Sequence, residues 1–158
     1  MKVRTDYVSN SSSSSFVIEK DAVNAAKMFL EDFGSYLTNC YCGEQFGETL
    51  HVGVKEKGNE DGWDEWMNPE KFAEIYIQGE YDCDTDTHAT PRKPEDIVEL
   101  SFDCDDWDRT GMMYLVFLYK YFKKFGFEIN TSCSEKDFPP KGDESFLGKI
   151  LDRLEPSA

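Results

Sequence analysis

The sequence predicts an α+β fold in which a mainly antiparallel sheet of short strands packs with about three helices. Segments with the two-residue alternation of strands are joined by links of hairpin length. Stretches with helical periodicity interrupt and flank these segments, whereas a doubly wound sheet would need regular strand–helix–strand repeats. The chain has 158 residues, of which 15% are aromatic, so we expect a single globular domain, 1–158, with a packed core.

The N-terminal part predicts two strands and a helix. Met1 to Val8 alternates loosely and is the expected first strand, and residues 16–18 resume an extended pattern. Between them, 9–15 is a serine-rich segment, which favours a solvated loop because serine hydroxyls bond turn backbone. Asp21 is the expected N-cap of a helix that ends at Gly34, with one apolar face formed by Ala22, Ala25, Ala26, Phe29, Leu30 and Phe33.

The central part predicts three strands and a short helix. Alternation of apolar and polar residues predicts strands over 49–56, 75–81 and 97–102. Asn68 followed by Pro69 has the form of a cap and a first-turn proline, so a helix through about Ala73 is expected. Two prolines and two cations predict a loop over 88–94.

The C-terminal part predicts two more helices around a strand. Thr110 is the expected cap of a strongly apolar helix that Gly126 ends, and lysines near its C-terminus complement the helix dipole. A strand is expected from Phe127 to Ile129. After two prolines break the chain, residues 146–154 have the pattern of a final amphipathic helix.

Most of the negative charge is concentrated between Glu56 and Asp108. This block holds eighteen acidic and four basic residues, so its formal charge is −14 of the chain's −15. Such a surface repels phosphate backbones, and direct binding to nucleic acid is therefore not expected. The charge favours a basic partner or a metal ion instead.

The composition also predicts a compartment. The first residues include Arg4, Asp6 and the serine run, so a secretory signal is not expected, and no apolar stretch approaches about 18 residues. We therefore expect a cytoplasmic protein that does not enter a membrane. The five cysteines are expected to be reduced thiols.

Two runs of aspartates within the block are the strongest candidate binding residues. On extended backbone, alternate carboxylates share one face, with a spacing of about 6.6 Å that is comparable with phosphates along a strand. We expect the two runs to gather into one anionic surface. The runs are Asp82, Asp84 and Asp86, and Asp103, Asp105, Asp106 and Asp108.

Known metal and phosphatase motifs do not fit these residues. In a calcium loop that starts at Asp82, Thr87 would replace the turn glycine and Lys93 the bidentate acid. The D-x-D-x-T pattern of aspartate-nucleophile phosphatases fails from either Asp82 or Asp84. Cys40 and Cys42 are spaced more tightly than the usual zinc pair, so we expect no metal site.

The remaining candidate groups predict neither catalysis nor a cofactor. His51 lies opposite the apolar face of its predicted strand and His88 lies in a loop, so spacing favours no catalytic pair. A phosphate-binding loop would need glycines followed by Lys-Ser or Lys-Thr, and the serine run has neither. We therefore expect no cofactor.

All three tryptophans fall inside the acidic block. Tryptophan is enriched among the residues that anchor protein interfaces, and a rim of carboxylates around it suits a basic protein surface. Core packing is the alternative for each ring, and the sequence leaves both open. The candidate anchors are Trp63, Trp66 and Trp107.

The N-terminus carries one resemblance. Residues 1–10, MKVRTDYVSN, followed by five serines and Phe-Val-Ile, resemble an opening of the type M-K-x-R-x-D-[FY]-V-[ST]-N-S-S-S-S-S-F. This opening is found in uncharacterised proteins of Firmicutes and their phages. The match covers about 18 of 158 residues. It implies a bacterial or phage setting and no particular activity.

Two functions from different classes are consistent with these observations. The leading hypothesis is a non-enzymatic acidic binding protein, of the kind that a phage or bacterium encodes as an inhibitor, which occupies the basic groove of a nucleic-acid-binding protein. The alternative is a metal-dependent phosphoester hydrolase that uses clustered aspartates. Its candidate ligands are Asp82, Asp84, Asp103 and Asp105.

Overall fold

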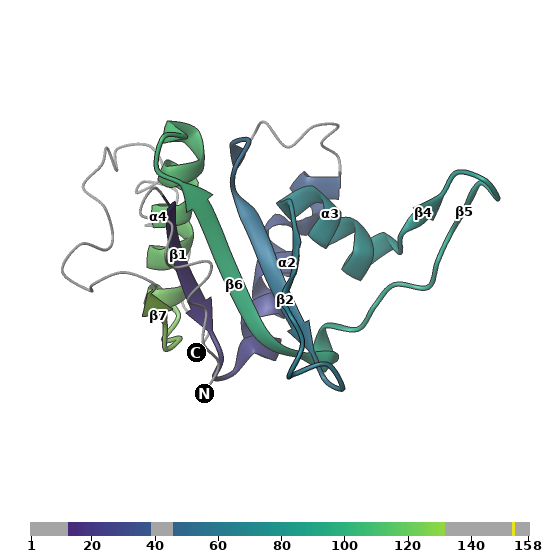
Figure 1. The fold of residues 1–158 in the computed structure, drawn as a ribbon, viewed down its shortest axis with the longest axis horizontal. Coiled ribbons are helices and arrows are strands. Elements are labelled where there is room, and N and C mark those ends of the chain that lie inside the picture. The colour runs from purple at the N-terminus through teal and green to yellow at the C-terminus, as the bar shows by residue number, and fades with distance from the viewer. Residues whose placement is uncertain (1–12, 39–45, 132–152, 154–158) are drawn as a thin grey trace.

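The computed structural model of the chain describes residues 13–38, 46–131 and 153. Its main element is a five-stranded sheet in the order β3-β2-β6-β1-β7, in which each neighbouring pair is antiparallel. Two long helices lie behind this sheet in Figure 1. The α+β class predicted from the sequence, with a mainly antiparallel sheet, is confirmed.

The sheet strands are β1 Ser13–Ile18, β2 His51–Glu56, β3 Glu65–Met67, β6 Ile97–Asp105 and β7 Asn130–Thr131. A second sheet pairs β4 Tyr81–Asp82 with β5 Thr87–His88. The helical elements are α2 Ala22–Thr38, α3 Pro69–Ala73, the π-helix η2 Glu74–Gln78, the 3-10 helix η3 Pro94–Asp96 and α4 Arg109–Lys124.

The core lies between the sheet and the two long helices. Phe16 on β1 and Phe102 on β6 are register partners and face the same side. The ring of Phe102 lies 5.5 Å from Phe29 of α2 and 5.6 Å from Phe122 of α4, measured between centroids. All four rings are buried, and removing this apolar surface from water is the main force that holds the layers together.

The opposite face of the sheet is polar. Lys55 of β2 lies opposite Glu99 of β6, and its ammonium is 3.1 Å from the carboxylate of Asp64. The side chains of Lys55 and Asp64 are only 3% and 6% exposed, so this is a buried ion pair. The ring of Trp66 packs directly on Gly53 of β2. A Cβ atom at Gly53 would be only 2.7 Å from this ring, so a side chain there would displace it.

Several predicted strands are confirmed and others are wrong. Strands predicted over 49–56 and 97–102 correspond to β2 and β6. The strand predicted over 75–81 is wrong, because most of it continues α3 as the π-helix η2. Ser13–Ser15, predicted as the end of a loop, belongs to β1, because it pairs with β6 over 103–105. The strand predicted at Phe127–Ile129 is displaced to β7.

The helices follow the predictions except at their ends. The helix predicted to end at Gly34 continues to Thr38, and the end of the Ile77 side chain packs against Gly34 within it. The predicted cap Thr110 lies within α4, and Asp108 caps that helix instead. The helix predicted after Asn68 is confirmed as α3.

Some predictions lie outside the described residues. They are the first strand at 1–8, the beginning of the serine run, the cysteine pair at 40 and 42, and all of the final helix except Arg153. Among the described residues, no helix has the length and apolar composition that crossing a membrane requires.

Candidate functional site

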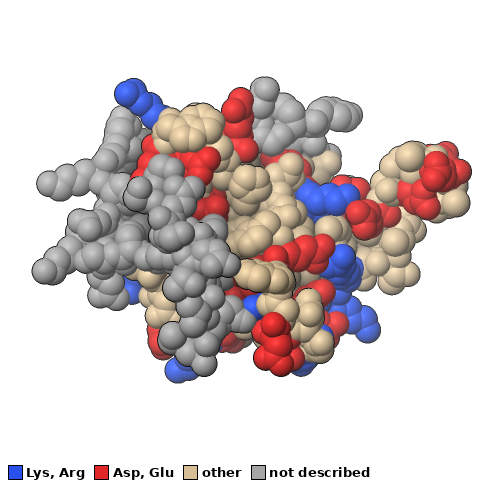
Figure 2. Space-filling model, in the orientation of Figure 1, with Lys and Arg blue, Asp and Glu red and all other residues tan. Residues whose placement is uncertain are grey.

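The β4–β5 hairpin projects from the body of the molecule as an arm (Figure 1). We call residues 80–90 the acidic arm. They contain four carboxylates and no lysine or arginine, and every residue in this range is exposed. Figure 2 shows the carboxylates gathered at the end of this projection. The arm therefore presents negative charge at a distance from the rest of the surface.

The acidic arm begins directly after the π-helix η2, which Gly79 caps at its C-terminal end. The Gly79 N–H donates to the carbonyl oxygen of Glu74 over 2.7 Å, and Gly79 has a φ of 86°, which favours glycine. The Glu74 carboxylate accepts a hydrogen bond from the Tyr81 N–H, and the Ala89 N–H donates to the Glu80 carbonyl oxygen. These bonds close the base of the hairpin.

Arg92 attaches the returning end of the arm to the body. Its backbone N–H donates to the carbonyl oxygen of Ile75 over 3.0 Å. Its guanidinium donates to both carboxylate oxygens of Glu65 on β3, at 2.7 and 3.4 Å, and lies 3.6 Å from Glu56 on β2. The bonds to Glu65 raise the pKa of Arg92 above its ordinary value, so this side chain stays charged.

The end of the arm is ordered by its own side chains. Asp82 accepts a hydrogen bond from the Asp84 N–H, and the Tyr81 hydroxyl donates to Asp86 over 2.5 Å. The bond to Asp86 raises the pKa of Tyr81. The Tyr81 and His88 rings lie 5.3 Å apart, so one exposed aromatic pair accompanies the carboxylates.

The first aspartate run therefore does not have the geometry that the sequence predicts. Only Asp82 is in a strand, and the residues from Cys83 to Asp86 form a turn. The prediction that Asp82, Asp84 and Asp86 alternate along extended backbone, at a spacing like that of phosphates, is therefore wrong. Asp82 ends β4, and Asp84 and Asp86 lie in the turn that follows it.

The second run lies at another part of the molecule. It covers the last residues of β6 and the turn that leads into α4, far from the arm in Figure 1. Asp105 and Asp106 are accessible to solvent, and Asp106 accepts a hydrogen bond from the Ser14 hydroxyl. Asp103 faces the polar side of the sheet, in register with His51. The single anionic surface expected from the sequence is not formed.

Asp108 has a structural role. Its buried carboxylate accepts hydrogen bonds from the Gly111 N–H, which caps α4, and from the N–H and hydroxyl of Thr49. Burial alone would raise its pKa, but these hydrogen bonds hold the pKa of Asp108 below its ordinary value. The group is bonded to α4 and to Thr49 and exposes little surface to a partner.

The three tryptophans have different surroundings. Trp63 and Trp107 are 81% and 65% exposed, whereas Trp66 packs on Gly53. Trp107 follows Asp106 directly in the sequence, so one exposed tryptophan lies in the second aspartate run. None of these rings belongs to the acidic arm.

The ligands proposed for a hydrolase are divided between these two regions. Asp82 and Asp84 are on the arm, while Asp103 and Asp105 are on β6, so the four carboxylates cannot share one ion (Figure 1). Within residues 13–38, 46–131 and 153, no three His, Cys, Asp or Glu side chains form a group that could hold a metal ion.

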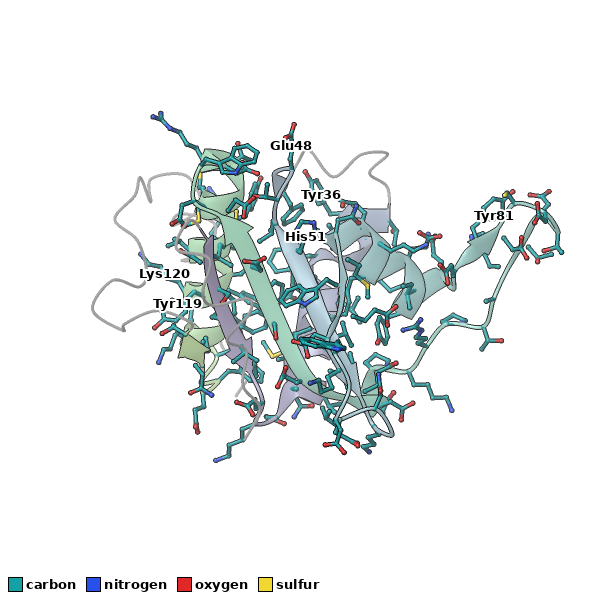
Figure 3. All side chains as sticks on the ribbon, in the orientation of Figure 1. Tyr36, Glu48, His51, Tyr81, Tyr119 and Lys120 are labelled. Atoms are coloured by element: carbon teal, nitrogen blue, oxygen red, sulfur yellow. The ribbon has the colours of Figure 1, made fainter. Side chains whose placement is uncertain are left out.

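The two histidines of the described chain lie in different regions, one on β2 and one on β5. Figure 3 shows His51 well away from Tyr81 on the arm, and His51 begins β2 of the main sheet. His88 is on the arm itself. Cys83 is an exposed free thiol, and Cys104 is a buried one whose pKa is raised to about 12 by burial.

Comparison of the chain with protein-family models, curated proteins and solved structures found no match. Function must therefore be inferred from the geometry. The projection of the arm was not predicted from the sequence, although one signal was present. The stretch between Gly79 and Pro91 contains no aliphatic residue larger than alanine, so it had nothing to bury in a core.

Proposed function

We propose that this chain is a non-enzymatic binding protein whose acidic arm enters the basic groove of a nucleic-acid-binding protein and blocks it. The observation that carries the proposal is the arm itself, a projecting hairpin with carboxylates at its end and no basic residue. A projection can enter a groove that a flat acidic surface could not reach. Carboxylates within it would then take the place of phosphates.

The order within the arm supports a binding role. Tyr81, Asp82 and Asp86 are held by hydrogen bonds in an exposed turn, so less conformational entropy is lost when a partner fixes them. Tyrosine is enriched at interfaces, and Tyr81 is 46% exposed beside the carboxylates. We propose a cytoplasmic setting, in which such partners occur. The N-terminal resemblance supports a bacterial or phage origin.

Competition with DNA tests this function. The probes are purified small basic DNA-binding proteins, each bound to a fluorescent duplex, and anisotropy reports release of the duplex as the acidic protein is added. We expect release by the natural protein and a loss of about tenfold or more in potency for the triple variant D82N/D84N/D86N.

The control is a triple variant with the same change of charge elsewhere. E31Q/D61N/E128Q neutralises three exposed carboxylates of the body. If the arm makes the contact, this variant keeps most of its potency. Equal loss in both triple variants would mean that only net charge matters, and no release of DNA from any probe would contradict the proposed function.

A further inference from the structure

We infer that Arg92 is the positioning residue of the acidic arm, which it holds in the direction that a partner meets. This inference rests on the proposed function, because direction matters only if the arm binds something. It concerns a residue that makes no contact with the partner. Arg92 follows the arm, and its contacts are all on the body.

The contacts of Arg92 join the arm to three other elements. Its backbone N–H binds a carbonyl oxygen of η2, and its guanidinium binds Glu65 on β3 and approaches Glu56 on β2. Glu56 in turn accepts a hydrogen bond from the Tyr76 hydroxyl on η2 over 2.9 Å. The cation therefore links the two sheet strands to the turn from which the arm starts.

Removal of the guanidinium would loosen this attachment from one side. Glu56 and Glu65 would remain as neighbouring carboxylates without their shared cation. The side-chain contact that ties the returning end of the arm to β3 would be lost. The other end of the arm would still be held by the Lys71–Glu80 ion pair at 3.0 Å and by the hydrogen bonds around Gly79. The fold should therefore persist while the arm gains freedom.

Electrostatics and positioning predict opposite effects on binding. Replacement of Arg92 with methionine makes the protein more negative by one charge, so attraction to a basic probe should increase. If Arg92 positions the arm, the same change should weaken binding, because the partner must then order a mobile arm. Weaker binding by Arg92→Met would therefore indicate a positioning role, and tighter binding would indicate an effect of charge alone.

The experiment compares Arg92→Met with Lys93→Met. Lys93 is the next residue and is exposed, so its replacement makes the same change in net charge. Binding to a fluorescent deca-lysine peptide is measured for both, together with hydrogen exchange of the arm amides. We expect about three- to tenfold weaker binding and faster exchange for Arg92→Met. Lys93→Met should bind as tightly as the natural protein or slightly more tightly.

Arg92→Lys gives a further reading, because it keeps the charge but loses the paired contact with Glu65. It should recover part of the affinity. If Arg92→Met unfolds, Glu65→Gln removes the same contact from the body and should accelerate exchange in the arm. Unchanged or tighter binding by Arg92→Met, or exchange in the arm that is no faster, would overturn the inference.

Failure of the proposed function gives a different result. If the natural protein and Lys93→Met both fail to bind deca-lysine, the binding role is wrong, whatever Arg92 does. Faster exchange in the arm of Arg92→Met would then still show that Arg92 holds the arm. Normal binding by the natural protein with no effect of Arg92→Met would leave the function intact and remove the positioning role.

Discussion

Gly79 lies so close to Ala89 that a Cβ atom on Gly79 would overlap the carbonyl oxygen of Ala89. This contact brings together the two ends of the acidic arm. It also coincides with a φ of 86°, which L side chains rarely adopt. Gly79 therefore combines two requirements that only glycine meets, at the point where the chain leaves the π-turn.

Replacement of Gly79 with alanine should open the base of the arm. We expect a loss of about 1–3 kcal/mol in the local stability of the hairpin, from the strained φ and the overlap together. Hydrogen exchange of the arm amides measures this loss. Gly58→Ala is the control, because Gly58 has a φ of 89° with no atom within 4 Å of the added Cβ. If both variants behave alike, the contact with Ala89 is unimportant.

Asp108 and Thr110 give a second comparison. Asp108→Ala should cost about 1–2 kcal/mol of unfolding free energy, because it removes the cap of α4 and the bonds to Thr49. Thr110→Ala should change stability by less than about 0.5 kcal/mol, since Thr110 is exposed and is not the cap. Urea denaturation measures both, and a larger cost at Thr110 would contradict the assignment of the cap.

The low pKa of Asp108 also predicts a dependence on pH. A carboxyl whose pKa is lower in the folded state stabilises the fold fully above its unfolded value, near 3.8. This contribution is lost as the pH falls through the lower, folded value. Asp108→Asn should therefore remove part of the acid sensitivity of the natural protein. If the unfolding free energies of both proteins depend on pH in the same way, Asp108 does not contribute to the acid sensitivity.

The ion pair on the polar face should be sensitive to removal of one partner. Lys55→Met would leave the buried Asp64 carboxylate without its cation, and we expect a cost of about 3–5 kcal/mol. The double variant K55M/D64L should recover much of this loss. Lys27→Met, which breaks the exposed pair with Glu95, should lower the unfolding free energy far less than Lys55→Met, because solvent screens that pair. If Lys55→Met and Lys27→Met lower the unfolding free energy by similar amounts, the Lys55–Asp64 pair is not buried as described.

The two described thiols should differ in reactivity. Cys83 is exposed on the acidic arm, whereas burial raises the pKa of Cys104 to about 12. Iodoacetamide at about pH 8 should therefore alkylate Cys83 in the folded protein and leave Cys104 intact until urea unfolds it. Peptide mass mapping distinguishes the sites. Rapid alkylation of Cys104 without denaturant would contradict its burial.

The elements that were predicted correctly have patterns that arise from their own residues. β2 alternates because only one of its faces meets the apolar core, and α3 begins where Asn68 and Pro69 provide local capping. The errors come from contacts distant in sequence. Alternation at Ile75 and Ile77 suggested a strand, but Ile77 packs on Gly34 of α2 within a π-turn.

The candidate site was predicted only in part. The sequence offered the aspartates and tryptophans as candidates and placed the second run before a helix, yet periodicity could not show that the first run would end a projecting hairpin far from the second. Asp108 was not recognised as a cap because Thr49, which supplies two of its hydrogen bonds, is 59 residues away. Arg92 was missed because its partners Glu56 and Glu65 belong to strands of the main sheet.

The most direct test of the arm is an NMR titration of isotopically labelled protein with deca-lysine at about 150 mM salt, where distant charges are screened. The account predicts that the largest shifts occur in the amides from Glu80 to Thr90. Amides near Asp61, Trp107 and Glu128 should change little. Shifts spread evenly over all exposed carboxylates, or concentrated near Trp107, would contradict it.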